Sequence, residues 1–382
     1  DVDALFWVTP PGFGSDNVAS QALLGDLDGN GLRDIVVPSG GQWHWLRHSS
    51  GSTYSYSPTG VVDSVPAGGT SLADIDGDGR DDFVYVKDSG ATLAWRRNLT
   101  AAGVPAFATE AVLWTAPTGT RIVAKPFLAA AQRSRSTERR ADFNGDGRDD
   151  LLLRVQVDGC GGATGCVSNW TERWQVFASR GSSLVAQSLL DGASDPLLAD
   201  FNADGLTDVV YAYNGLTWRL VLGSGRRGSV DAGLSSPVGS SAPASGSTGK
   251  ALVVDWDGDG RTDLMIPGAS EWLACRSLGM LIETCRGTGL ASSGVLANSA
   301  VLDADGDGLP DLAVAASSSR FRPHAPGRAD LLVAAEDGHG VRVEFEYSPL
   351  TRPGVHVASR TSTYPVSDYA APAVVVSRLT AS

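Results

Sequence analysis

Short apolar runs recur along the chain, and each lies between residues that favour turns. Examples are "DIVVPS", "DFVYVK" and "DLMIPG", which are rich in β-branched and other apolar residues. Such runs predict β-strands joined by tight turns. No apolar run approaches the roughly 20 residues that a membrane-spanning helix requires. The pattern therefore predicts an all-β protein built from many short strands.

One acidic stretch precedes such a strand six times, in copies that we number loops 1 to 6. The copies begin at Asp26, Asp74, Asp142, Asp200, Asp255 and Asp303. One apolar strand comes before each copy, and a second strand, a third that often carries tryptophan and a variable fourth come after it. Repeats of about 50 residues with four strands each are typical of β-propeller blades. We therefore expect a β-propeller of four-stranded blades, with the acidic loop between the first and second strands; six blades are favoured, and the tail after Asp311 makes seven the alternative.

The six loops share the pattern D-x-[DN]-x-[DN]-G-x-x-D, which places side-chain oxygens at positions 1, 3, 5 and 9. Glycine at position 6 permits a sharp turn that brings these oxygens together, and position 7 can add its backbone carbonyl. The arrangement is similar to the first half of an EF-hand loop, and hard oxygen ligands in a flexible loop favour Ca²⁺ over Mg²⁺ and Zn²⁺. The alternatives are a metal-free Asp/Gly turn and a catalytic role, which a site repeated in every blade does not favour.

We therefore expect about six Ca²⁺ ions, one for each loop. The expected ligands are Asp26, Asp28, Asn30, Leu32 and Asp34; Asp74, Asp76, Asp78, Arg80 and Asp82; Asp142, Asn144, Asp146, Arg148 and Asp150; Asp200, Asn202, Asp204, Leu206 and Asp208; Asp255, Asp257, Asp259, Arg261 and Asp263; and Asp303, Asp305, Asp307, Leu309 and Asp311.

The charge of the chain fits this hypothesis. The formal net charge is −13, and 21 of the 43 acidic residues stand at ligand positions. Six divalent cations would bring the net charge close to zero, so the acidity needs no basic partner, and it argues against binding of nucleic acid. Without metal the clustered carboxylates repel one another, and we expect calcium to stabilise the fold. Because charge count tunes affinity, loop 1, with three carboxylates, is expected to be among the weaker sites.

The four cysteines form two local pairs. Cys160 and Cys166 bracket "GGATG", and Cys275 and Cys285 bracket "RSLGMLIET". Neither pair has zinc-finger spacing, so we expect two disulfides, with four free thiols as the alternative. Disulfides imply an oxidising, extracytoplasmic setting. The chain has no visible signal peptide and no initial Met, and we interpret it as a mature piece or an excised domain.

Tryptophan recurs in the third predicted strand of the repeats. These residues are Trp45, Trp95, Trp174, Trp218 and Trp272. They are expected to pack between blades, because a core position recurs in every unit whereas a binding site need not. The alternative is a set of sugar-stacking platforms.

The six acidic stretches resemble the FG-GAP/VCBS repeats of integrin-α-type propellers, over about residues 20–315. The resemblance implies a propeller fold and calcium binding. It says little about function, because such propellers occur in adhesins, lectins and toxin scaffolds alike.

The C-terminal stretch "EDGHGVRVEFEYSPLT", with its later "VVSR", resembles the segment that follows such repeats in bacterial Rhs/YD-repeat proteins and in the B component of insecticidal toxin complexes. The matching residues are Tyr347, Ser348, Pro349, Leu350, Thr351, Tyr364, Pro365, Val375, Val376, Ser377 and Arg378. His356 stands near a place where the family usually has tyrosine. The resemblance implies a propeller over residues 1–348 and a C-terminal β segment over 349–382 that completes or leaves it. It also implies a secreted bacterial protein whose propeller docks onto a partner channel and gates passage of an enclosed toxic domain.

The resulting functional hypothesis is a calcium-stabilised, non-catalytic interaction scaffold of a larger secreted protein. Its expected partner is another protein or the downstream domains of the same polypeptide. The alternative is a lectin or adhesin propeller that binds glycans. No G-x-S-x-G, Walker or HExxH motif occurs in the sequence, and we expect no enzymatic activity.

Overall fold

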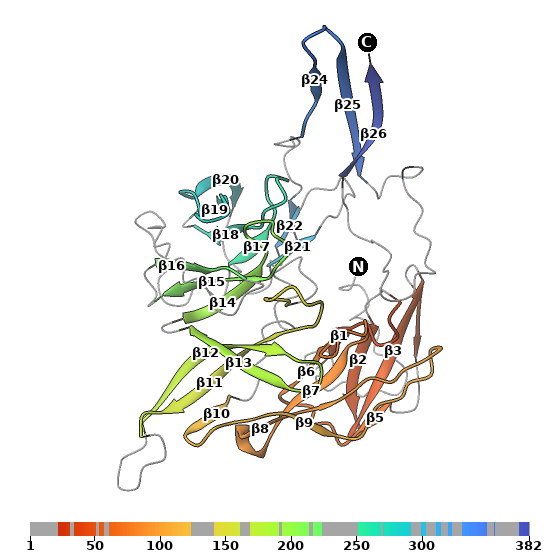
Figure 1. The fold of residues 1–382 in the computed structure, drawn as a ribbon, viewed down its shortest axis with the longest axis vertical. Coiled ribbons are helices and arrows are strands. Elements are labelled where there is room, and N and C mark those ends of the chain that lie inside the picture. Colours follow the sequence, from red (N-terminus) through yellow and green to blue (C-terminus); the bar gives the residue numbers. More distant parts are fainter. Residues whose placement is uncertain are drawn as a thin grey trace. The chain divides into compact units, whose positions relative to one another are not determined.

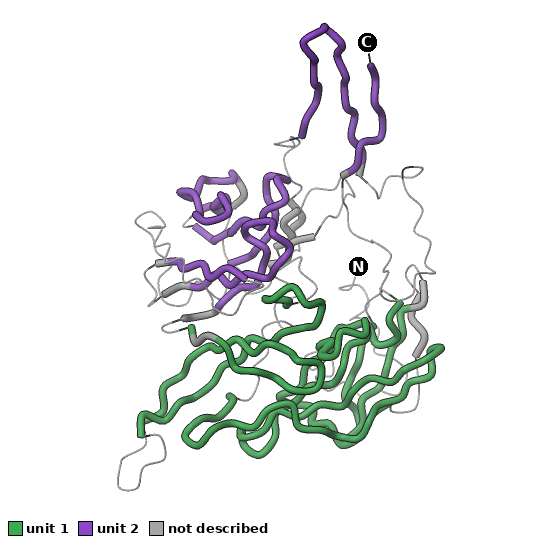
Figure 2. The backbone as a smooth tube through the Cα atoms, in the orientation of Figure 1, with its two compact units in different colours: residues 1–131, 140–191, 360–368 green, residues 132–139, 192–359, 369–382 purple. Residues whose placement is uncertain are grey.

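The computed structural model describes residues 22–30, 34–50, 53–56, 61–123, 141–160, 169–190, 193–213, 217–223, 251–268, 270–291, 299–302, 311–314, 320–322, 331–349, 355 and 374–381. The chain divides into two compact units (Figure 2). The first comprises residues 1–131, 140–191 and 360–368, and the second comprises residues 132–139, 192–359 and 369–382. Within the described ranges, no helix has the length and apolar character needed to cross a membrane.

The described part of the first unit holds three antiparallel sheets (Figure 1). The first sheet contains β1 (Leu23–Gly25), β2 (Asp34–Ser39), β3 (Gln42–Ser50) and β4 (Thr53–Tyr56) in chain order, with β5 (Val62–Asp63) paired to β3. The second contains β6 (Thr70–Ala73), β7 (Asp82–Lys87), β8 (Thr92–Arg96) and β9 (Ala111–Thr115), with the short 3-10 helix η3 (Asp88–Gly90) between β7 and β8. The third contains β10 (Thr120–Ile122), β11 (Leu151–Asp158), β12 (Trp170–Ser179) and β13 (Leu184–Leu190).

The described part of the second unit holds four antiparallel sheets. Three follow the repeats: β14 (Ala193–Ala199), β15 (Asp208–Tyr213) and β16 (Thr217–Val221); β17 (Leu252–Val254), β18 (Asp263–Pro267), β19 (Glu271–Cys275) and β20 (Arg286–Ala291); and β21 (Ser299–Leu302), β22 (Asp311–Val314) and β23 (Arg320–Arg322). The fourth contains β24 (Ala334–Glu336), β25 (Arg342–Pro349) and β26 (Val374–Ala381), so β25 spans the expected domain boundary at 348/349.

This architecture confirms the all-β prediction and its division into small antiparallel sheets. Each acidic loop lies between the first two strands of its sheet, as in the β1–β2 and β6–β7 pairs. In the third repeat a longer connection, which contains residues 124–140 outside the described ranges, separates β10 from loop 3. The meanders are consistent with a propeller-like fold. The number of blades stays a prediction, and the expected closing strand at 4–10 lies outside the described residues.

The core lies between successive sheets of a unit. In β7, Phe83 and Tyr85 belong to a buried cluster with residues of the first sheet, whereas Val84 belongs to a cluster with Leu151 and Leu153 of the third. Neighbouring residues of one strand therefore face opposite sheets, and both faces are buried. This two-sided burial explains why the strands read as continuous apolar runs and not as alternating patterns.

The recurring tryptophans support the packing interpretation. Trp45, Trp95, Trp218 and Trp272 are buried, whereas Trp174 is only partly buried. These tryptophans occupy two different positions along the third strand. Trp45 pairs with Val36, the second residue after its acidic loop. Trp218 and Trp272 pair with the fourth residue after theirs, as Trp43 does in β3. Buried rings of this kind fill space between sheets and offer no open face to a sugar.

Candidate metal centres

The carboxylate at position 1 folds each described loop. In loop 2, Asp74 Oδ1 accepts hydrogen bonds from the backbone N–H groups of Gly77 and Asp78 at 2.9 and 3.0 Å, and its Oδ2 accepts one from Gly79 at 2.9 Å. Gly77 and Gly79 have φ values of 76° and 86°, a backbone conformation that glycine adopts without strain. The aspartate at position 1 therefore forms an Asx-type turn, in which its carboxylate accepts hydrogen bonds from the backbone N–H groups of the residues that follow it.

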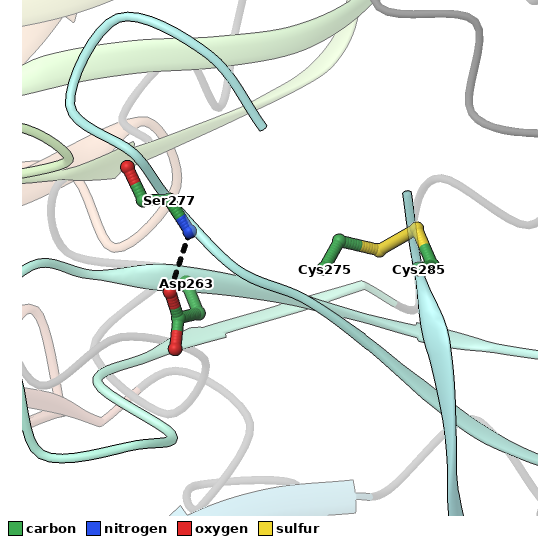
Figure 3. Close-up of a disulfide and its surroundings, with 4 residues drawn as sticks. All are labelled: Asp263, Cys275, Ser277 and Cys285. Carbon is green, nitrogen blue, oxygen red and sulfur yellow. Dashed lines mark hydrogen bonds between the residues drawn. A yellow bond between two sulfur atoms is a disulfide. The ribbon is translucent and has the colours of Figure 1, made fainter. Parts of the chain in front are cut away.

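The carboxylate at position 9 joins the loop to the third strand. Its Oδ2 accepts the N–H of position 2, and its Oδ1 accepts a backbone N–H at the end of the third strand. In loop 5, Asp263 accepts the N–H of Trp256 at 3.0 Å. It also accepts the N–H of Ser277 at 2.7 Å (Figure 3). The same pair of bonds recurs in loops 1, 2, 3 and 4 at Asp34, Asp82, Asp150 and Asp208.

Burial makes the negative charge at position 9 costly. Desolvation raises the pKa of Asp34 to about 8 and that of Asp82 to about 9, although the backbone N–H bonds lower both values. In loops 3, 4 and 5 desolvation likewise raises the pKa of the position-9 carboxyl group to about 7. The surrounding protein groups thus do not balance this charge, and a cation in the loop would do so.

Position 3 carries oxygens that the described protein atoms leave unused. Asp28 Oδ1, Asp76 Oδ1 and Asp257 Oδ1 are buried and accept no hydrogen bond. The side chain of Asp28 is only 3% exposed. A buried carboxylate oxygen without a hydrogen bond is energetically costly, and a cation in the loop would offset this cost.

The structure brings the predicted ligands together in three loops. Oxygens of Asp26, Asp28 and Asp34 lie within 4.8 Å of one another, as do those of positions 1, 3 and 5 in loops 2 and 5. These sets contain only oxygen donors, so they fit a hard divalent cation such as Ca²⁺ and do not fit zinc. In loops 3 and 4, asparagine at position 3 instead accepts the backbone N–H of position 5.

Some predicted ligands cannot be placed. Leu32 in loop 1 and Asp303, Asp305, Asp307 and Leu309 in loop 6 lie outside the described residues. Asp311 begins β22, and its side chain is outside the description. A ligand role for the carbonyls at position 7 stays a prediction.

Each of loops 1 to 5 also forms hydrogen bonds with a neighbouring loop of the same unit. Asp81, at position 8 of loop 2, accepts the N–H of Asp26 through Oδ2 and donates its own N–H to the Asp26 carbonyl, both at 2.8 Å. Asp149 of loop 3 makes the same pair of bonds with Asp74, and Thr262 N–H of loop 5 reaches the Asp200 carbonyl at 2.9 Å. Gly25 permits the close approach, because a Cβ there would lie 2.3 Å from Asp81 Oδ2.

A side chain at the end of the third strand adds a second bond between repeats. Asn98 is fully buried, and its Nδ2 donates to the Leu27 carbonyl at 2.8 Å and to the Asp81 carbonyl at 2.9 Å. The hydroxyls of Ser179 and Ser277 donate to the position-2 carbonyls of loops 2 and 4 in the same way. Sequence reasoning missed these residues and position 8, although the paired acids in "GRDD" were a visible signal.

The predicted disulfides are confirmed for the cysteines that the structure describes. Cys275 and Cys285 form a disulfide across β19 and the approach to β20 (Figure 3). Cys160 is disulfide-bonded as well, and its expected partner Cys166 lies outside the described residues.

Two segments of the chain, residues 26–85 and 200–266, match the family model of the FG-GAP-like repeat. The sequence matches no curated protein. Similar solved structures include an Agrocybe aegerita lectin that recognises non-reducing terminal N-acetylglucosamine, at 18% identity and a TM-score of 0.49, covering 76% of this chain and 73% of that one. Another is a Photorhabdus luminescens Tc holotoxin pore, at 16% identity and a TM-score of 0.45, covering 87% of this chain and 15% of that one. A third is the rhamnogalacturonan lyase YesX, at 16% identity and a TM-score of 0.39, covering 84% and 61%.

Proposed function

We propose that the acidic loops hold Ca²⁺ and that the ions make the chain a rigid, non-catalytic interaction scaffold. The observation that carries this proposal is the buried, unpaired Oδ1 at position 3 of loops 1, 2 and 5. It lies beside further carboxylate oxygens in a set without nitrogen or sulfur donors. Calcium accepts six to eight oxygen ligands in flexible geometry, which suits a loop of glycines and aspartates better than the strict octahedron of Mg²⁺ does.

The bonds between repeats explain how a local ion would stiffen a whole unit. A cation in loop 2 would fix positions 1 to 9, and position 8 of that loop binds the backbone of Asp26 in loop 1. Position 1 of loop 2 in turn binds Asp149 of loop 3. An ordered loop thus holds both of its neighbours in register, so that the sheets of the unit present a fixed surface to a partner.

Calcium titration of the chelator-treated protein tests the metal proposal. We expect isothermal titration calorimetry to show about one ion for each intact loop, at affinities in the range of extracellular or sensor sites. Asp76→Asn removes one charge and one unpaired oxygen from loop 2, so it should weaken one site about tenfold or more. Asp88→Asn, in an exposed turn outside the loops, is the matched control and should leave the titration unchanged. Absence of heat at millimolar calcium would overturn the proposal.

We further propose that the scaffold belongs to a larger secreted bacterial protein of the Rhs or toxin-complex type and binds a protein partner. The disulfides support the extracytoplasmic part of this proposal. The C-terminal resemblance, through Tyr347, Pro349 and Arg378 of the β25–β26 pair, supports the family part.

A glycan array separates this proposal from the lectin alternative. We expect no specific, saturable binding, because four of the five recurring tryptophans that would have supplied stacking platforms are buried. Saturable binding to one glycan class, lost when calcium is removed, would instead establish the lectin function.

A further inference from the structure

Three loops pair their position-3 aspartate with an arginine from the third strand. Arg47 contacts Asp28, Arg97 contacts Asp76 and Arg276 contacts Asp257, each through the Nε and Oδ2 atoms. Each arginine directly precedes the residue whose N–H binds the position-9 carboxylate. The guanidinium thus occupies one oxygen of the aspartate, while the other, Oδ1, stays without a hydrogen bond inside the loop.

Loops 3 and 4 provide a comparison within the same chain. Their position 3 is asparagine, Asn144 or Asn202, and the residues that correspond to the arginines are Ala178 and Leu222. In the five loops that the structure describes, arginine therefore accompanies aspartate, and an apolar residue accompanies asparagine. In the sixth repeat Leu312 pairs with Arg322, and the sequence continues with Pro323, which lies outside the described residues, as does loop 6.

A second set of arginines acts on position 5. Where position 7 is arginine, its guanidinium pairs with the position-5 aspartate of the same loop. The pairs are Arg80–Asp78, Arg148–Asp146 and Arg261–Asp259. Loop 4 has Leu206 at position 7 and none of these contacts.

The two sets of arginines equalise the charge of the ligand groups. Loops 2 and 5 each have four ligand carboxylates and two arginines, and loops 1 and 3 each have three carboxylates and one arginine. With every carboxylate counted as ionised, all four ligand groups have a formal charge of −2, whereas loop 4, with three carboxylates and no arginine, has −3. A single divalent cation neutralises a group of −2.

We propose that Arg47, Arg97 and Arg276 set the charge of their loops to match a divalent cation, and thereby limit calcium affinity while stabilising the metal-free state. This inference rests on the proposed calcium function. It changes the expected order of the sites: loop 1 is no weaker than loops 2, 3 and 5, and loop 4 binds most tightly among the described loops. The arginines are positioning and charge-setting residues, since they contact the ligands and not the ion.

A double-mutant cycle in loop 2 tests the proposal. Arg97→Gln should tighten calcium binding at one site about tenfold and terbium binding about thirtyfold, because the removed repulsion scales with the charge of the ion. In chelator, the same variant should unfold a few degrees lower than the unchanged protein, because the loop loses its counter-charge. Arg97→Gln combined with Asp76→Asn places an asparagine beside an uncharged residue, as in loops 3 and 4, and should return both affinities close to their original values.

Two controls separate charge from shape. Arg97→Lys keeps the charge and should leave both affinities within about twofold. Arg154→Gln breaks a partly exposed ion pair with Glu172 on β11 and β12, away from the loops, and should change neither affinity. Unchanged or weaker calcium binding by Arg97→Gln would overturn the inference. Absence of calcium binding by the unchanged protein would instead overturn the proposed function.

Discussion

Removal of calcium is expected to lower the thermal midpoint of the protein by roughly 10–20 °C. An ion that binds the folded state at 100 times its dissociation constant contributes about 2.7 kcal/mol for each site. Several such sites act on one chain, and in a protein of this size each kcal/mol shifts the midpoint by about 2 °C. The metal-free loops also retain buried position-3 oxygens that accept no hydrogen bond, and position-9 carboxyl groups whose pKa desolvation raises.

Differential scanning calorimetry in chelator and in excess calcium measures this shift. Magnesium at the same concentration is the control for ionic strength and should restore only a small part of the midpoint. Asp76→Asn should reduce the calcium-dependent shift by the contribution of one site and leave the midpoint in chelator nearly unchanged. A midpoint that is the same in chelator and in calcium would contradict the proposed role of the ion.

The carboxylate clusters of loops 1, 2 and 5 were predictable from sequence because their spacing is local. Nine residues contain every side chain of a loop, so the pattern at Asp26 or Asp74 already specifies which oxygens meet. The Cys275–Cys285 pair was predictable for the same reason, since its members are only ten positions apart in the sequence. Continuous apolar runs such as the one in β7 likewise identified strands. Because both faces of these strands are buried, the sequence could not show which residue packs against which neighbouring sheet.

The features that sequence reasoning missed depend on contacts between distant residues. In the sequence, Asn98 begins "NLT", which has the pattern of a glycosylation sequon. In the structure its side chain is buried and donates to the carbonyl of Leu27, 71 residues earlier. The sequence alone gives no sign that Arg47 has a partner. In the structure, strand pairing brings it to Asp28, 19 residues earlier, and the two form an ion pair. The register of β3 also decides that Trp43, and not Trp45, is the equivalent of Trp218. Each of these depends on strand register, which a single sequence specifies only weakly.

Replacement of Asn98 by alanine is expected to destabilise the protein by about 3 kcal/mol. The side chain supplies three hydrogen bonds in a fully buried site: Nδ2 donates to the carbonyls of Leu27 and Asp81, and Oδ1 accepts the N–H of Thr100. Alanine leaves all three partners unpaired, and each buried, unpaired polar group costs about 1–3 kcal/mol. Leu27 and Thr100 are themselves almost fully buried, so water cannot readily replace the lost bonds.

Asn98→Ser is the matched variant, because serine occupies this place in the third and fifth repeats. There the hydroxyls of Ser179 and Ser277 reach the position-2 carbonyl of the preceding loop, so serine at 98 should preserve the bond to Leu27 and lose about half as much stability as alanine does. Urea unfolding in excess calcium compares the two variants. The alanine variant should also weaken calcium binding at loop 1, since Leu27 directly follows the first ligand and its carbonyl would no longer be held. If the alanine and serine variants proved equally stable, the side chain of residue 98 would not join these repeats. The two hydrogen bonds between Asp26 and Asp81, one of them to the Asp81 carboxylate, would then make that contact alone.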